Sequence, residues 1–410
     1  MEISYYHKAL VVAVIAVFYT YVPPYIYGLF GSPLEWKHWM MVFWVLALPL
    51  ILTHATSWNA LGSPIMGWVV AYVVMTLIWF ALSSQSDMSW QEVRNRLMAI
   101  LEILSFLLIF WEPVAARLAR KTLVGAVIAG AVINIYEIFF PMSFSAVLGR
   151  SAGLYGNPTQ AGEALVLGMI VCVTVLEPKY RGPFMLLTGI GIFTTFSRAA
   201  ILGWVIAVAG LLFVRKLSLK DFLPSVFVGL VLGLLILLPY WDTLLTTWDR
   251  NGVSNSNVEE RLAWFSDPSG VSDYSSWERK YLAQRAWEKI AERPILGSGT
   301  GSSYAAYTAP HNQYLSFMLD HGLIGALVIP MLLVTIMWGA QGETKQVAIV
   351  FSCVVLVLCF FTHTILNTTY SLVLFSLMTA MTATSSRYEM TNSRIRETRD
   401  VRTAQVLVQA

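Results

Sequence analysis

Five residues, His311-Asn-Gln-Tyr-Leu315, bring an imidazole, two amides and a phenol to the point where a long polar segment meets a long apolar run. A histidine pKa near ~6.5 leaves the ring mostly neutral at neutral pH and able to accept a proton. We therefore predict that His311 is a general base in the first turn of a helix, supported by Asn312 and Tyr314. There the helix dipole disfavours the imidazolium and attracts anions. A histidine that only caps the helix is the competing interpretation.

Three arginines are candidates for binding a phosphate group, because the planar guanidinium binds two phosphate oxygens at once and stays charged. Arg198 opens an apolar run, where a cation is costly unless it has a purpose, although it could instead snorkel to the membrane surface. Arg261 lies in the polar segment before His311, where a local ion pair with Glu259 or Glu260 is the alternative. Arg150 is the third candidate and could equally be an interfacial anchor.

The elements that position these residues are apolar helices. The chain has 410 residues, of which 57% are hydrophobic and only 12% charged, a composition typical of a protein dissolved in lipid. A helical span needs roughly 20 apolar residues, and about twelve such runs can be read. They cover 8–22, 36–53, 64–83, 97–115, 121–140, 160–176, 183–197, 199–215, 222–240, 311–338, 345–362 and 364–384. The sequence predicts an all-α polytopic membrane protein, in which 183–197 and 199–215 could form one broken hairpin.

The positive residues predict the orientation. With both termini inside, the inner segments hold most of the 27 Lys and Arg residues, as the positive-inside rule requires. The predicted organisation is transmembrane helices 1–9 in residues 1–240, one large outer loop in 241–310, transmembrane helices 10–12 in 311–384, and a cytoplasmic tail in 385–410. The first apolar run is expected to be a retained span, since it lacks a small-residue cleavage site.

The sequence predicts no metal and no other cofactor. The 3 cysteines lie in apolar runs and the 6 histidines lack metal-binding spacing. A formal net charge of only +3, spread over several loops, argues against nucleic acid as a partner.

The segment 241–310 contains an amphipathic pattern between Trp277 and Arg293. Its apolar residues, expected on one side, are Trp277, Tyr281, Ala283, Trp287, Ile290 and Ala291. Such a helix either packs over the bundle or lies in the membrane interface. The following stretch, Gly297-Ser-Gly-Thr-Gly301, lacks the strand and spacing of a dinucleotide loop, so we expect a connecting turn rather than a phosphate cradle.

Several motifs together resemble the O-antigen ligase and polymerase superfamily, over residues of about 145–330. They are Arg150-Ser-Ala-Gly153, Asn157-Pro158, Ser197-Arg-Ala-Ala200, Arg293-Pro-Ile-Leu-Gly-Ser-Gly299, His311-Asn-Gln-Tyr-Leu315 and His321-Gly-Leu-Ile-Gly325. The order of the motifs carries the resemblance, because each alone is weak. The single dominant outer loop is similar to the arrangement in the ligases.

The resemblance implies a GT-C-like glycosyltransferase of the bacterial inner membrane with a periplasmic active site. Its donor would be an undecaprenyl diphosphate-linked glycan and its acceptor lipid A-core. On this interpretation His311 is the base, Arg198, Arg261 and Arg150 bind the diphosphate, and the reaction inverts the sugar without a metal. A polymerase or a protein O-oligosaccharyltransferase differs only in acceptor. A lipid-linked saccharide flippase is the alternative of another class, and the paired halves it would need are not visible.

Four further ionisable residues fall within or at the edge of apolar runs: Asp320, His321, Glu137 and Glu163. Ionisable groups inside a membrane are functional candidates, but they can also bridge helices. The sequence assigns no role to any of them.

Overall fold

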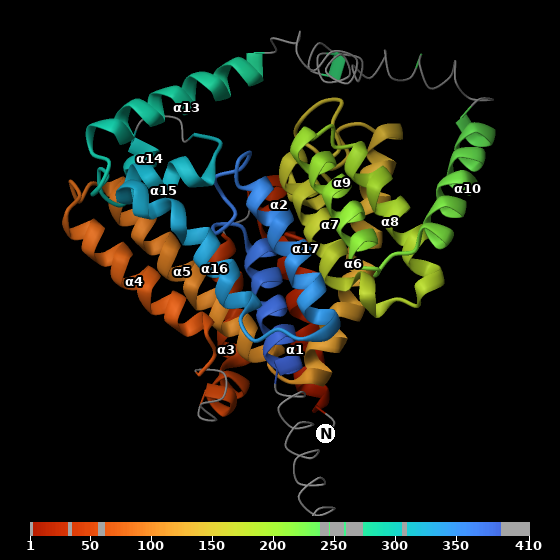
Figure 1. The fold of residues 1–410 in the computed structure, drawn as a ribbon, viewed down its shortest axis with the longest axis horizontal. Helices are drawn as coiled ribbons and strands as arrows, with labels where there is room; N and C mark the ends of the chain where they lie inside the picture. Colours follow the sequence, from red (N-terminus) through yellow and green to blue (C-terminus); the bar gives the residue numbers. More distant parts are fainter. Residues whose placement is uncertain are drawn as a thin grey trace, which may run out of the picture.

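The computed structural model (Figure 1) describes residues 3–31, 35–55, 62–237, 246, 258–259, 274–305 and 310–386. Within these ranges the chain is helical and contains no strand. The helices described before the large polar segment are α1 Tyr5–Ala13, η1 Val14–Tyr19, α2 Val22–Phe30, α3 Trp36–Ala55, α4 Ile65–Ala81, α5 Asp87–Phe110, α6 Pro113–Phe139, η2 Gly153–Tyr155, α7 Pro158–Cys172, η3 Val173–Val175, α8 Pro178–Phe193, α9 Arg198–Phe213 and α10 Leu219–Leu237. Those after it are α13 Tyr274–Glu292, α14 Ser302–Ala305, α15 Gln313–His321, η5 Gly322–Leu327, α16 Val328–Met337, α17 Gly342–Leu358 and a last helix over 369–386.

Each predicted apolar run is largely helical in the described structure, and the runs 183–197 and 199–215 form the α8–α9 hairpin. Four described helices are long and apolar enough to cross a membrane, or five if the bent pair Tyr5–Tyr19 and Val22–Leu29 is one span. Large apolar side chains are exposed around the bundle, for example Val45 (73%) and Phe227 (68%), as expected of a surface covered by lipid. The chain is an all-helical membrane protein, and the count of about twelve spans stays a prediction.

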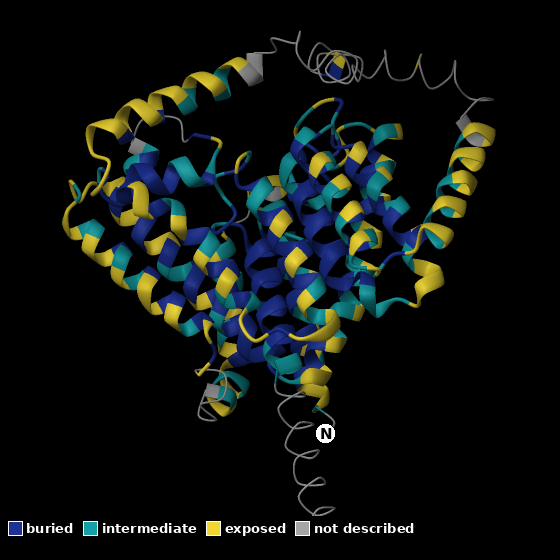
Figure 2. Cartoon of the chain, in the orientation of Figure 1, coloured by how far each residue is buried: buried dark blue, intermediate teal, exposed yellow. Residues whose placement is uncertain are grey.

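Helix α7 lies at the centre of the bundle. It packs against α6, α8, α9 and α17, and almost all of its residues are buried (Figure 2). Its close packing depends on small residues, since a methyl group at Gly162 would overlap the Cβ of Ala200 on α9. Asn157 caps the helix by accepting from the backbone N–H groups of Thr159 and Gln160.

The helix α13 lies across one end of the bundle, and the N-terminus lies at the opposite end (Figure 1). The inner face of α13 buries Ala286 and Ile290 against Met318 and Leu319 of α15. Of the apolar side predicted for this helix, Ile290 is buried, whereas Trp277, Tyr281 and Trp287 are exposed. The buried face of α13 therefore coincides only in part with the side that holds its large aromatic residues.

Candidate active site

His311 lies at the end of the bundle that α13 covers. Asn312 is the N-cap of α15, with its side-chain oxygen 3.1 Å from the N–H of Leu315. The prediction that His311 belongs to the first helical turn was wrong. Asn312 is the N-cap, so His311 is the residue before the cap and lies outside the helix. Gln313, the first residue of α15, fixes the start of the helix, since its backbone N–H donates to Cys359 O at 2.8 Å.

His311 is an exposed residue, and protein covers only part of its ring. This burial lowers the pKa of His311, and the nearby charge of Arg279 lowers it further, against a smaller opposing effect of Glu278. Both charged residues belong to α13. The imidazole is therefore neutral at neutral pH, the form that a general base needs.

A second imidazole, His363, packs against His311. The ring centroids are 5.1 Å apart and the planes meet at 68°. On its other side His363 lies 6.3 Å from the ring of Tyr304, whose hydroxyl accepts a hydrogen bond from Asn367 Nδ2 at 3.2 Å. Burial and the neighbouring His311 lower the pKa of His363 to about 4, so this ring also stays neutral.

The charge of Arg279 acts on His311 and also on Glu163, a buried residue of α7. Burial lowers the pKa of Arg279, and the charge of Glu163 raises it. Glu163 is 1% exposed, and its Oε2 accepts from the Tyr370 hydroxyl at 2.9 Å. Its Oε1 is buried and has no hydrogen-bond partner among the described residues. His363 thus packs on His311, and the charge of Arg279 acts both on His311 and on Glu163.

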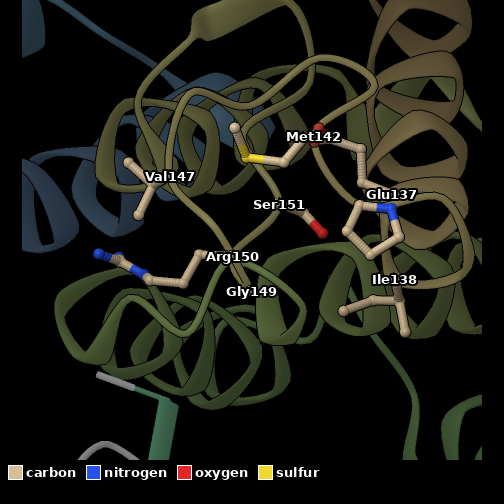
Figure 3. Close-up of a pocket in the computed structure, with 8 residues that line it drawn as sticks. Glu137, Ile138, Met142, Val147, Gly149, Arg150 and Ser151 are labelled. Carbon is tan, nitrogen blue, oxygen red and sulfur yellow. The ribbon is translucent and has the colours of Figure 1, made fainter. Parts of the chain in front are cut away.

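Arg198 lies at the turn between α8 and α9, and Arg150, in the connection between α6 and α7, contacts that turn. Arg150 donates from Nε to Thr195 O at 3.0 Å, and Arg198 is the first residue of α9, which Ser197 caps. Figure 3 shows the Arg150 guanidinium directed away from Glu137. The cavity beside Arg150, about 10 Å³, has room for no more than a water molecule.

Glu137 fixes the segment that carries Arg150. Its carboxylate accepts from the backbone N–H groups of Phe144, Ser145, Ala152 and Gly153, at 2.9, 2.5, 2.8 and 2.8 Å. A buried carboxylate with this many donors is fully satisfied. Glu137 is therefore an anchor for the connection between α6 and α7.

Comparison with protein families identifies the chain. Residues 183–330 match the family described as O-antigen ligase. Residues 183–330 are thus a domain of the O-antigen ligase and polymerase superfamily. The chain is accordingly a membrane enzyme of the glycosyl-transfer type that this superfamily contains. No curated protein matches it.

The superfamily match contains Arg198, Arg261, Arg279 and His311. Arg150 and His363 lie on either side of it. Arg261 falls outside the described residues, so its predicted contact with phosphate stays a prediction. Tyr314, predicted to support catalysis, donates its hydroxyl to Leu356 O at 2.9 Å and packs on Phe360. These contacts hold α15 against α17.

Asp320 and His321 belong to a buried ion-pair network of this superfamily member. Arg96 of α5 donates to Asp320, to His321 Nε2 at 2.5 Å and to Glu92 at 2.8 Å. Asp320 is 0% and Arg96 2% exposed. The Asp320 carboxylate also accepts from the N–H of Ser303 at 3.0 Å. Its charge is therefore used to join α5, α14 and α15.

The glycine segment Gly297-Ser-Gly-Thr-Gly301 is a tightly packed turn, as predicted. The N–H groups of Ser298 and Gly299 donate to backbone oxygens of α15 at 2.8 and 3.0 Å, and that of Gly301 donates to the Asp320 carboxylate at 3.2 Å. A phosphate would find these donors occupied. Gly301 has φ of +89°, and a methyl group there would lie 2.8 Å from the α5 backbone.

Sequence reasoning missed His363 and Arg279. His363 had only the weak signal of an ionisable residue at the end of an apolar run, and Arg279 was one of several charges on an amphipathic helix. Within the described ranges no three His, Cys, Asp or Glu residues form a group suited to a metal ion, and metal independence remains a prediction.

Proposed function

We propose that the protein is an O-antigen ligase, which transfers O-antigen polysaccharide from undecaprenyl diphosphate to lipid A-core on the periplasmic face of the bacterial inner membrane. The observation that carries the proposal is the neutral His311 beside Arg279, under α13, in a chain whose residues 183–330 match the O-antigen ligase family. A base next to a cation is what transfer from a glycosyl diphosphate needs.

In the proposed reaction, a hydroxyl oxygen of the acceptor sugar attacks the anomeric carbon of the donor. The bond between that carbon and the diphosphate oxygen breaks, and the electron pair leaves with undecaprenyl diphosphate. His311 takes the hydroxyl proton as the new glycosidic bond forms. Because the attack is a single displacement on the face opposite the leaving group, the configuration inverts, and the step requires no metal.

The proposed role of the arginines is to stabilise the leaving diphosphate. Arg198, Arg261 and Arg150 follow from the family motifs, and Arg279 joins them because its charge acts on His311. Guanidinium groups suit this task, since charge-assisted hydrogen bonds are about twice as strong as neutral ones. Asn312 supports the site by capping α15, which fixes the position of His311.

The orientation of the chain follows from the proposal. The site lies at the end of the bundle under α13, opposite the N-terminus, so a periplasmic site requires a cytoplasmic N-terminus. The cation distribution of the sequence predicts the same orientation.

The decisive experiment is transfer of a radiolabelled undecaprenyl diphosphate glycan to purified lipid A-core in detergent and chelator. We expect labelled lipid A-core with wild type, and loss of at least about 100-fold with His311→Ala, the usual size of a general-base contribution. His54→Gln is the matched control, because His54 is a half-buried imidazole on α3, packed on another histidine, His7. It should retain transfer.

Two other outcomes distinguish the alternatives. Growth of the glycan on the donor, with no product on lipid A-core, would make the protein an O-antigen polymerase, and a glycosylated protein acceptor would make it an O-oligosaccharyltransferase. Movement of the intact donor across a vesicle membrane without transfer would identify a lipid-linked saccharide flippase. Unchanged transfer by His311→Ala would remove His311 from the mechanism.

A further inference from the structure

The connection between α13 and α14 forms a cavity with the end of α4. The cavity measures about 440 Å³, which lies within the range of about 300–1,000 Å³ that is usual for ligand sites. It is lined by Leu82, which follows α4, and by most of the motif Arg293–Gly299. The proposed reaction assigns no role to this motif. The cavity combines an apolar lining with one cation, Arg293.

Hydrogen bonds to the backbone hold the walls of the cavity in place. On one side the indole N–H of Trp79, a residue of α4, donates to Leu296 O at 2.5 Å. On the other side the N–H of Leu323, which follows α15, donates to Pro294 O at 2.7 Å. The cavity is therefore part of the fold, and a ligand does not have to order its walls on binding.

A row of apolar side chains on α4 leads to the cavity. Successive members are four residues apart, so each is a neighbour of the next on the helix surface. All are between 48% and 60% exposed: Val70, Val74, Ile78 and Leu82. Helix α4 lies at the edge of the bundle (Figure 1), and Figure 2 shows its outer side exposed. Because the polar turn 83–87 follows the row, the cavity lies where the lipid-facing surface ends and water begins.

The lining of the cavity fits a lipid with a phosphorylated head group. Ile295 and Leu296 are 76% and 58% exposed, and they continue the apolar surface beyond the end of α4. Acyl chains are the groups that such a surface accommodates. The guanidinium of Arg293 suits a phosphate, because it binds two phosphate oxygens at once and stays charged.

The position of the cavity distinguishes between the two lipids of the proposed reaction. Gly299 donates its N–H to Asp320 O at 3.0 Å, near the end of α15, whereas His311 precedes the cap at its start. The helix from Asn312 to Asp320 is about 12 Å long at ~1.5 Å per residue. The donor carries its diphosphate on the reacting carbon, so a cation this far from the base cannot bind it. The acceptor has a core oligosaccharide between its lipid and its reacting hydroxyl.

We propose that this cavity binds the lipid A portion of the acceptor, with a phosphate group at Arg293 and an acyl chain along the apolar row of α4. The inference rests on the proposed function. The core oligosaccharide then bridges the length of α15 to His311. The cavity positions the acceptor and takes no part in the chemical step.

Binding is measured with the full-length protein in phosphatidylcholine nanodiscs to which lipid A-core is added, and native mass spectrometry counts the lipid A-core that stays bound. We expect Arg293→Gln to reduce this retention about tenfold, since charge-assisted hydrogen bonds to the phosphate are lost. Ile295→Glu should also reduce retention, because it places a negative charge in the lining. Arg285→Gln is the matched control: Arg285 lies over Tyr281 on α13 and does not line the cavity. It should retain lipid A-core like wild type.

Transfer then separates the acceptor from the donor. Arg293→Gln should raise KM for lipid A-core about tenfold, whereas KM for the donor should not rise. The difference from wild type should disappear when the acceptor is lipid-free core oligosaccharide. A higher KM for the donor, or an equal rise for both acceptors, would overturn the proposal.

Competition tests the identity of the lipid. Phosphatidylglycerol at the same concentration should leave most of the lipid A-core bound to wild type, because it lacks the phosphorylated sugars. Equal displacement would make the cavity a site for anionic phospholipid in general, and would overturn the proposal as well.

These measurements keep the two proposals apart. If wild type transfers no glycan to lipid A-core but retains lipid A-core through Arg293, the ligase proposal fails and the lipid site stands. If transfer depends on His311 while Arg293→Gln and Ile295→Glu alter neither retention nor KM, the lipid site fails alone.

Discussion

The substitution Arg96→Met is expected to destabilise the fold strongly. Arg96 is 2% exposed and is the cation for two buried carboxylates, Glu92 at 2.8 Å and Asp320. Methionine fills a similar volume and removes only the charge and its hydrogen bonds. Removing one partner from a buried ion pair costs about 3–5 kcal/mol, because the remaining charge stays buried without compensation. With two carboxylates left, we expect the upper part of that range.

The expected loss in the free energy of unfolding is large compared with that of a variant in which the partner charges are removed as well. A loss of about 4 kcal/mol lowers the folding equilibrium constant by roughly three orders of magnitude. The triple variant Arg96→Met, Glu92→Gln and Asp320→Asn removes the uncompensated charges and should recover most of this loss. The side-chain carbonyl introduced by Asp320→Asn can still accept from the Ser303 N–H, the contact that holds α14.

The assay is reversible unfolding in mixed micelles, followed by tryptophan fluorescence and circular dichroism. The reasoning would be refuted if Arg96→Met lay within about 1 kcal/mol of wild type, since a buried ion pair cannot be so weakly coupled. It would also be refuted if the triple variant were less stable than the single one. Transfer activity should fall with stability, because the network fixes α15, which begins directly after His311 and its cap.

Three further predictions concern the site and its supporting turn. Replacing His363 by Gln exposes His311 to more water and raises the pKa of His311 toward its ordinary value. Because the neutral base is active above its pKa, the acid limb of the pH profile of kcat/KM should move to higher pH, and the rate at pH 8.5 should be retained. An acid limb that does not move would contradict the contact between the two rings. Arg279→Gln removes a positive charge that lowers the pKa of His311, so the acid limb of the same pH profile should move to higher pH. In steady-state kinetics KM for the donor should rise about tenfold. An unchanged KM would remove Arg279 from diphosphate binding. Gly301→Ala should lower the free energy of unfolding by about 1–3 kcal/mol, because φ is +89° and the added carbon meets α5. The control Gly233→Ala, in a helix with open space around this residue, should be neutral or stabilising. Equal effects of the two substitutions would contradict the strain at Gly301.

The helices followed from the sequence because a span of membrane imposes a simple rule. In lipid every backbone N–H and C=O must bond within its own segment, so a long apolar run forms a helix. The same local logic predicted the connecting turn at Gly297–Gly301 and a polar start for the next helix, although it placed that start at His311 and not after the cap Asn312. Each of these features depends on residues close together in the chain.

Chain-local patterns were less informative about which face of a helix is buried. The sequence put Trp277, Tyr281 and Trp287 on one side of α13 together with Ile290, and left open whether that side packs on the bundle or lies in the membrane interface. In the folded chain Ala286 and Ile290 pack against α15. Fit at a contact depends on the partner surface, which the sequence of one helix does not contain.

The sequence by itself determined the class of the protein, its superfamily motifs and the choice of His311 as candidate base. Only the tertiary structure brought the ring of His363 and the charge of Arg279 to that residue, from two other segments of the chain. It also gave Asp320 a partner, Arg96, more than two hundred residues away. The physical reason is that burial and neighbouring charge decide what an ionisable group does, and both are properties of the packed bundle rather than of the local sequence.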